Sequence, residues 1–100
     1  MPNLYITEFN LEGVDAMGRL MPAARTIPIA EQKVTFTTST QSAALNASTT
    51  LVRLHTDGAC SVAFGTNPTA TTSNMRMALD QTEYFAVQPG TGLKIAAISN

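Results

Sequence analysis

The stretch from Leu51 to Gly65, LVRLHTDGACSVAFG, decides the fold class. It contains two runs in which apolar residues alternate with polar or small ones, and Asp57-Gly58 lies between them. Successive side chains of a strand point to opposite faces, so each run has one apolar face. An Asp-Gly pair tolerates the positive φ angles of a type I′ turn, and we therefore expect a β-hairpin. A lone hairpin is marginal in water, so this one needs further strands to pack on.

The composition indicates a single small domain whose surface carries few charges. The chain has 100 residues, of which 44% are hydrophobic and 13% are charged, whereas about 25% charged residues is usual. Such a surface suits a protein that lies against other subunits. The alternative is a small β-domain whose polar face is rich in Thr, which is a good strand residue.

Charge and cysteine content disfavour several kinds of partner. The net charge is −1 and there is no basic stripe, so nucleic-acid binding is not expected. One cysteine leaves no internal disulfide and no Cys-based metal site. The first residues do not resemble a signal peptide, and no apolar run approaches the about 18 residues of a membrane span. We expect synthesis in the cytoplasm and no membrane partner.

The residues from Asn3 to Phe9, NLYITEF, are expected to form the first strand. Leu4 and Ile6 share one face of this strand. Tyr5 and Phe9 share the other face. A strand with apolar groups on both faces is either central in a sandwich or pressed between its own domain and a neighbour.

The segment from Asn10 to Ala30 contains many apolar residues but no regular period. Glycines and prolines interrupt it, while apolar residues recur with neither a helical nor a strand period. Three interpretations stay open: a loop packed on its own sandwich, an arm that contacts another subunit, or a disordered segment. We divide the chain into an N-terminal strand and extended arm at 1–30 and a β-sandwich body at 31–100, within one domain overall.

The remaining strands are short and are separated by turn signals. They are expected at Glu31 to Thr38, in the two runs of Leu51 to Gly65, at Met75 to Leu79, Thr82 to Val87 and Leu93 to Ile98, with an optional strand at Ala43 to Leu45. Seven or eight short strands with this spacing predict an all-β fold, an antiparallel β-sandwich, jelly roll or small barrel. The side chains expected to face inward are Val34, Phe36, Val52, Leu54, Cys60, Val62, Phe64, Met77, Phe85, Val87, Leu93 and Ile95.

The residues that could carry chemistry are sparse. His55 is the single histidine, and an acid–base group with Asp57 and Asp80 is conceivable. On the strand pattern, however, His55 lies outward, and no nucleophile elbow is present, so we expect a surface or subunit-contact histidine. Cys60 is expected to be a small buried hydrophobe. We expect no catalytic residue, no metal site and no cofactor.

Two further motifs are read as structural or as weak binding signals. The segment PGTGLK, Pro89 to Lys94, lacks the spacing of a phosphate loop and is followed by a strand, so we expect a turn. The chain has no Trp. A sugar-binding platform stacks rings on an exposed aromatic side chain, and only Tyr5 or Tyr84 could serve.

Much of the chain resembles small proteins encoded among the head genes of tailed bacteriophages. The segments that carry the resemblance are NASTTLVRLHTDGACSVAFG from Asn46, the continuation TNPTATTS, and TEYFAVQPGTGLKIAAI from Thr82. The matching positions are Thr50, Val52, Arg53, Asp57, Cys60, Phe64, Gly65, Pro68 to Thr71, Glu83 to Phe85, Val87 and Lys94 to Ala96. The start, MPNLYITEF, is also similar, and the likeness covers most of the chain outside Asn10 to Ala30. The resemblance implies a virion structural protein with a capsid cement or decoration role.

The leading hypothesis is therefore a non-enzymatic protein that binds the outer surface of a phage capsid as an oligomer and stabilises the head. Its partners would be the major capsid protein and other copies of itself, as a dimer or trimer, and its place would be the capsid surface of the virion. The interface residues of this hypothesis are Leu4, Tyr5, Ile6, Phe9, Leu11, Leu20, Met21, Ile27 and Ile29. A head–tail, tail or fibre-associated binding module is the alternative, and a small β-barrel enzyme is a third.

Overall fold

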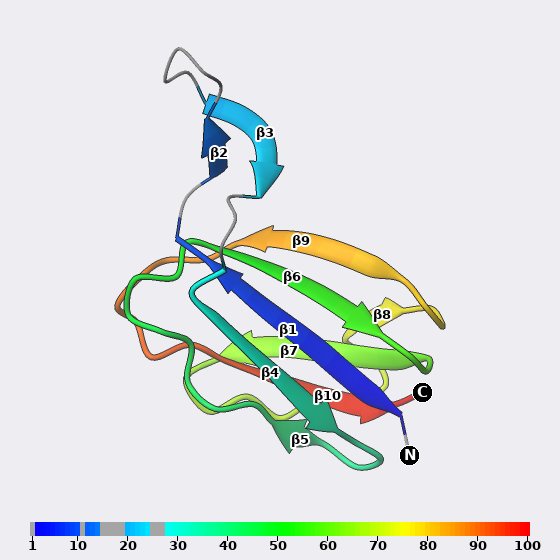
Figure 1. Cartoon of the computed structure of the whole chain (residues 1–100). Helices are drawn as coiled ribbons and strands as arrows, with labels where there is room; N and C mark the ends of the chain where they lie inside the picture. Colours follow the sequence, from blue (N-terminus) through cyan, green and yellow to red (C-terminus); the bar gives the residue numbers. More distant parts are fainter. Residues whose placement is uncertain (1, 11, 15–19, 25–27) are drawn as a thin grey trace.

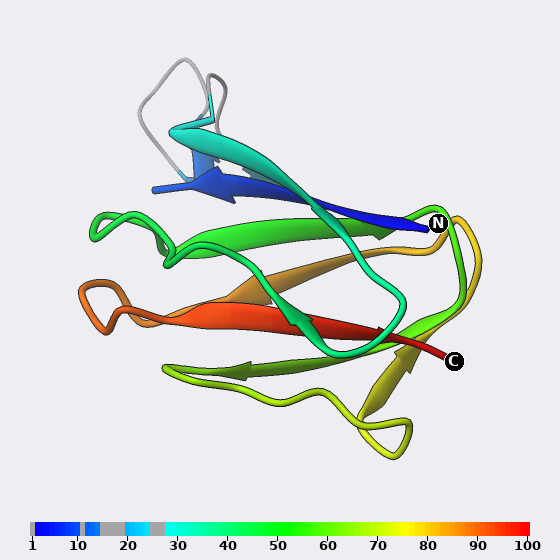
Figure 2. The ribbon, with the colours of Figure 1, turned by 90° about the horizontal axis from the view of Figure 1, so that it is seen from below.

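Two four-stranded antiparallel sheets pack face to face in the computed structural model (Figures 1 and 2). The structure describes residues 2–10, 12–14, 20–24 and 28–100, and the two short stretches are described by their backbone alone. The first sheet, in the order β4-β1-β6-β9, contains β1 (Asn3–Phe9), β4 (Ala30–Thr35), β6 (Leu51–Thr56) and β9 (Thr82–Ala86). The second sheet, in the order β5-β10-β7-β8, contains β5 (Thr40–Gln41), β7 (Cys60–Gly65), β8 (Met75–Met77) and β10 (Lys94–Ser99). The predicted all-β sandwich is confirmed.

The core lies between the two sheets and contains every side chain that was predicted to face inward. Eight of those twelve belong to the buried cluster, and Phe64, Phe85, Val87 and Leu93 pack against it partly buried. The rings of Phe64 on β7 and Phe85 on β9 meet edge to face at a centroid distance of 5.2 Å, which ties the second sheet to the first. The cluster has four further members, Leu4, Ile6, Leu45 and Ala97.

The stretch from Leu51 to Gly65 does not form the predicted hairpin. Its two runs are β6 and β7, which lie in different sheets, so the chain crosses the sandwich at Asp57-Gly58. Among the described residues, positive φ angles occur at Asp80, Gly90 and Gly92, and a type I′ turn at Asp57-Gly58 is therefore wrong. The apolar face of each run can be buried when the two runs pair within one sheet, and also when they lie in facing sheets. The alternation of apolar residues therefore did not distinguish the two arrangements.

The connections follow a jelly-roll pattern. The links β4–β5, β5–β6, β6–β7, β8–β9 and β9–β10 all pass from one sheet to the other. Eight strands that exchange sheets in this way are typical of a jelly roll. The start of β1 and the end of β10 lie side by side, since Pro2, Ser99 and Asn100 line one surface depression.

Strand β1 is an interior strand of the body. It pairs with β4 on one side (Leu4↔Val34) and with β6 on the other (Ile6↔Leu54). The side chains of Leu4 and Ile6 are 0% and 1% exposed. The predicted division at residue 30 therefore does not mark the edge of the folded body, because residues 3–9 are central to it.

A two-stranded antiparallel sheet replaces the predicted irregular arm. Strands β2 (Glu12–Val14) and β3 (Leu20–Ala24) pair at Glu12↔Ala24 and Val14↔Leu20, with an irregularity between. Neither strand pairs with the body, and Figure 1 shows both standing beyond the end of β1. Gly13 and Pro22 suggested a break, but in a two-stranded sheet each strand has a free edge where a missing N–H is tolerated.

Deletion of residues 1–30 is expected to unfold the protein. Loss of Leu4 and Ile6 alone removes two large core side chains at about 2–5 kcal/mol each, against a total stability of about 5–15 kcal/mol. Replacement of residues 12–24 by a short Gly-Ser linker is expected to leave a folded body. Circular dichroism and cooperative thermal unfolding check both variants, and a cooperatively folded 31–100 fragment would contradict the central place of β1.

Candidate functional site

The outward face of the first sheet is open, whereas the corresponding face of the second sheet is partly covered. The loop from Thr66 to Asn74 lies over the second sheet, where Pro68 and Ala70 are buried. The Gln41 side-chain amide donates to the carbonyl of Pro68 at 2.8 Å and holds the loop in place. Ala96 faces outward on β10 and is nevertheless 0% exposed. The surface that the fold leaves available is thus the outward face of the first sheet.

This open face carries two rows of side chains that run across its strands. The strand registers place Lys33, Tyr5, His55 and Thr82 in one row on β4, β1, β6 and β9. They place Glu31, Thr7, Arg53 and Tyr84 in the next row. Tyr5 and Tyr84 are 40% and 54% exposed, and they are the two tyrosines of the chain. Sequence reasoning named both as candidate exposed aromatic residues, but only the strand order brings them to the same sheet.

His55 is held within the open face by its neighbours. Its Nδ1 lies 2.7 Å from the Thr82 hydroxyl oxygen, and its Nε2 lies 3.8 Å from an Asp80 carboxylate oxygen. The ring of Tyr5 lies beside it, at a centroid distance of 6.4 Å and a tilt of 44°. Asp57, the other carboxylate considered for an acid–base group, is engaged with Asn3 instead. The histidine therefore contacts Thr82, Asp80 and Tyr5, and positions the Tyr5 ring.

Asp57 closes the crossover between the sheets by capping the start of β1. Its carboxylate accepts hydrogen bonds from the backbone N–H and, at 3.2 Å, from the side-chain amide of Asn3. The backbone N–H of Asn3 is the main reason that the pKa of Asp57 lies below its ordinary value, and the Asn3 amide adds to the effect. The backbone N–H of Asp57 in turn donates to the carbonyl of Asn3 at 3.1 Å.

The lowered pKa predicts a specific acid sensitivity. A carboxyl group whose pKa is lower in the folded than in the unfolded state stabilises the fold above its ordinary value of 3.8, and this contribution is lost as pH falls through the folded pKa. Asp57→Asn is expected to lower the urea midpoint of unfolding at pH 7. Below about pH 4, the midpoints of the variant and of wild type are expected to converge. An unchanged difference between the two proteins from pH 7 to pH 3 would contradict this role.

Cys60 and the segment from Pro89 to Lys94 are structural. The Cys60 thiol is 0% exposed, and burial raises its pKa, so it behaves as the predicted small hydrophobe. Gly90 and Gly92 adopt φ angles of 74° and 66° in the connection before β10, which confirms a turn. Within the described residues, no group of three or more His, Cys, Asp or Glu side chains comes together.

A buried carboxyl group lies near the base of the β2–β3 hairpin and holds a neighbouring loop of the body. Glu8 is 2% exposed, and its Oε1 accepts bonds from the Asn46 backbone N–H and the Thr49 hydroxyl, both at 2.7 Å. The Glu8 carbonyl accepts the Ile29 N–H at 2.8 Å. The Thr50 hydroxyl donates to the carbonyl of Asn10 at 2.5 Å. Both chain segments that lead into the hairpin are therefore bonded to the body.

Glu8→Ala is expected to destabilise the protein by about 2–3 kcal/mol, because it leaves the Asn46 N–H and the Thr49 hydroxyl without their acceptor in a buried place. Glu8→Gln keeps an acceptor oxygen of nearly the same shape and is expected to cost less than half as much. Urea unfolding of the three proteins measures the difference. Equal stability of the Ala variant and wild type would show that the carboxyl group does not hold this end.

The structure distributes the predicted interface residues unevenly. Leu4, Ile6 and Phe9 are 0%, 1% and 7% exposed, so they are buried within the body itself. The second sheet covers Leu4 and Ile6, which lie on the inward face of β1 and belong to the core cluster. Tyr5 is exposed and Ile29 is half-buried. Leu20 and Met21 lie in β3, whose side chains are not described, and Leu11 and Ile27 lie outside the described residues.

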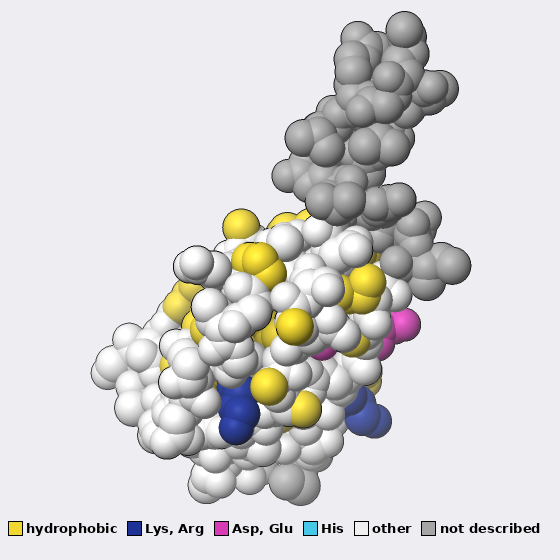
Figure 3. Space-filling model, turned by 90° about the vertical axis from the view of Figure 1, so that its left-hand side faces the viewer, with side chains coloured by type: hydrophobic (Ala, Val, Ile, Leu, Met, Phe, Trp, Pro, Cys, Tyr) yellow, Lys and Arg dark blue, Asp and Glu magenta, His cyan; other side chains and the backbone are white. Residues whose placement is uncertain are grey.

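Exposed apolar side chains are scattered over the described body and do not form one large patch. The largest of them are Tyr5, Met75, Leu79 and Tyr84. Figure 3 shows one end of the sandwich, where apolar side chains occur singly or in small groups between polar ones. Scattered groups of this kind are normal for a protein surface.

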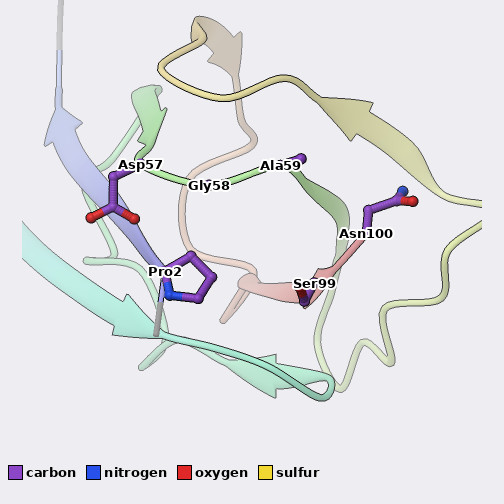
Figure 4. Close-up of a pocket in the computed structure, with 6 residues that line it drawn as sticks. All are labelled: Pro2, Asp57, Gly58, Ala59, Ser99 and Asn100. Atoms are coloured by element: carbon purple, nitrogen blue, oxygen red, sulfur yellow. The ribbon is translucent and has the colours of Figure 1, made fainter.

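A surface depression lies where the chain ends meet. It has a volume of about 490 Å³ and is lined by Pro2, Asp57, Gly58, Ala59, Ser99 and Asn100 (Figure 4). A Cβ on Gly58 would lie 2.5 Å from the Cβ of Pro2, so the close approach requires glycine. Asp57 and Asn100 are bonded to Asn3 and Ser61. We interpret this depression as a structural feature of the place where the two chain ends meet, and not as a binding site.

Comparison with protein-family models, with curated proteins and with solved structures gives no match for this chain. In the part of the chain that the structure describes, there is no helix of the length and apolarity needed to cross a membrane. The geometry described above provides two candidate sites, the open face and the β2–β3 hairpin, whose base is bonded to the body.

Proposed function

We propose that this protein is a non-enzymatic structural protein of a tailed-phage virion that binds the capsid surface as an oligomeric cement or decoration protein. The observation that carries the proposal is the β2–β3 hairpin, which pairs with neither sheet of its own body while its base is bonded to it. The sequence resemblance to small phage head proteins supports the same role.

The hairpin would act as a docking arm on the major capsid protein. Its sequence contains Val14, Leu20 and Met21, and Leu11 and Ile27 flank it. The bonds of Ile29 to Glu8 and of Thr50 to Asn10 hold the two ends of this segment on the body. Each contact is small, but many copies on one closed shell add their binding energies and resist the pressure of packaged DNA.

Strand addition is a plausible means of joining copies, but β1 cannot provide it because both of its edges are paired. In the first sheet, β9 pairs with β6 on one side and is the last strand in the order. Its residues, Thr82 to Ala86, include neither Lys nor Pro, the residues that commonly protect an edge. Self-association as a dimer or trimer would use this edge.

The alternative is a head–tail, tail or fibre-associated binding module. The observation that favours it is the open face, where both exposed tyrosines lie on one sheet. Immunogold labelling of purified virions separates the two proposals, since a cement protein decorates the whole head and a tail or fibre module labels one vertex or the tail.

Capsid binding is expected to require the hairpin. The variant with residues 12–24 replaced by a Gly-Ser linker should cosediment with purified capsids at least about tenfold more weakly than wild type. Leu79→Ser is the matched control, because Leu79 is 63% exposed and lies outside the hairpin, and it should bind as wild type does. Undiminished binding by the folded hairpin variant would overturn the proposed arm.

A further inference from the structure

We infer that the open face of the first sheet binds carbohydrate, with Tyr5 and Tyr84 as stacking platforms for two sugar rings of one oligosaccharide. The inference does not depend on capsid binding, because it concerns a surface of the body and not the hairpin. It rests on the two tyrosines, on the polar groups around them and on a depression beside Tyr5.

The depression beside Tyr5 provides a first subsite. It has a volume of about 280 Å³ and is lined by Tyr5, Ile6, Thr7, Glu31, Gln32 and Lys33. A sugar ring presents an apolar C–H face and a rim of hydroxyls, and it is held by an aromatic ring together with polar side chains. Glu31 is an acceptor, Lys33 is a donor and Thr7 can do both. Gln32 is engaged with the backbone of Ala43, which fixes this edge of the depression.

The second platform lies across the sheet. Tyr5 on β1 is opposite His55 on β6, and Tyr84 on β9 is opposite Arg53, two positions before His55 on β6. Two strand spacings and a two-residue offset separate the tyrosines by about 12 Å. An oligosaccharide of a few units can span this distance. Arg53 and His55 lie between the two platforms, where they can bond the hydroxyls of a middle unit.

The Tyr5 platform has an aromatic neighbour before a ligand arrives. His55 is bonded to Thr82 at 2.7 Å and lies beside the Tyr5 ring, so the ring has a packed neighbour on the side of β6. Preorganised rings cost less to immobilise on binding, which favours a weakly interacting ligand such as a sugar.

The charges of the open face favour a neutral ligand over the other occupants. Glu31 lies in the same row as Arg53 and next to Lys33 of the other row, so the face has no strong field of one sign. A nucleic acid would need a basic surface. A second copy pressed flat on this face would bury all three charges, whose desolvation is costly. A sugar leaves them partly in water and uses them as hydrogen-bonding groups.

The chain provides its own reporter for the test. It contains no Trp and two Tyr, and both tyrosines lie on the open face. Intrinsic tyrosine fluorescence therefore reports this surface alone. The probes are linear hexasaccharides of glucose, of mannose and of N-acetylglucosamine, titrated into the full chain, with isothermal calorimetry as the second measurement.

We expect a saturable change of fluorescence with at least one of these probes. Tyr5→Ala and Tyr84→Ala are each expected to weaken the calorimetric affinity by about tenfold, while Tyr84→Phe keeps the ring and stays close to wild type. Leu79→Ala is the control on a different surface. The same variants should cosediment with capsids as wild type does, so failure of this inference and failure of the capsid role are distinguishable.

Three results would overturn the inference. One is the lack of a saturable response to all three hexasaccharides by both measurements. Another is binding that survives the combined Tyr5→Ala and Tyr84→Ala substitutions in a folded protein. The third is a fluorescence change that depends on protein concentration and not on sugar concentration. That result would make the open face a contact between copies of the protein.

Discussion

The inward row of β1 is the constraint on which the rest of the structure depends. Leu4, Ile6 and Glu8 point between the sheets, and β1 is bonded to a neighbour along both edges. The first two fill the core. The third uses its carboxyl group to hold the loop at Asn46 and Thr49, which closes one end of the sandwich. Because β1 is interior, its outward side chains lie in the middle of the open face, and its continuation becomes the hairpin.

Much of the fold could be predicted because burial imposes a period of two. The alternation of Val52 and Leu54, and of Cys60, Val62 and Phe64, identified which side chains face inward. The same alternation did not show whether two consecutive runs pair or face each other, since both arrangements bury the same side chains. The Asp-Gly pair suggested a tight turn, but Asp57 bonds to Asn3, a residue 54 positions away, which no local rule anticipates.

The candidate sites were harder to predict for related reasons. Tyr5 and Tyr84 were the two candidate exposed aromatic residues, yet they lie on one surface only because β6 lies between β1 and β9. Strand order of this kind is set by the whole core and not by a motif. Glu8 shares a face with Leu4 and Ile6, which was visible in the pattern, but its partners Asn46 and Thr49 depend on the loop conformation.

The two candidate surfaces belong to different parts of the chain. The hairpin has a free edge on each strand and belongs to neither sheet. The open face is polar and aromatic, with both signs of charge. On the two proposals, the hairpin would anchor the body to a shell while the open face contacts the surrounding glycans. The two roles would be separable by mutation.

The adjacency of Pro2 and Asn100 has a practical consequence for protein engineering. Both ends of the chain emerge at the pole of the sandwich opposite the hairpin (Figure 1). A tag, enzyme or epitope fused to either end would sit on the far side from an anchored hairpin and would face bulk solvent. A particle coated with such fusions would present its cargo outward at every decorated position.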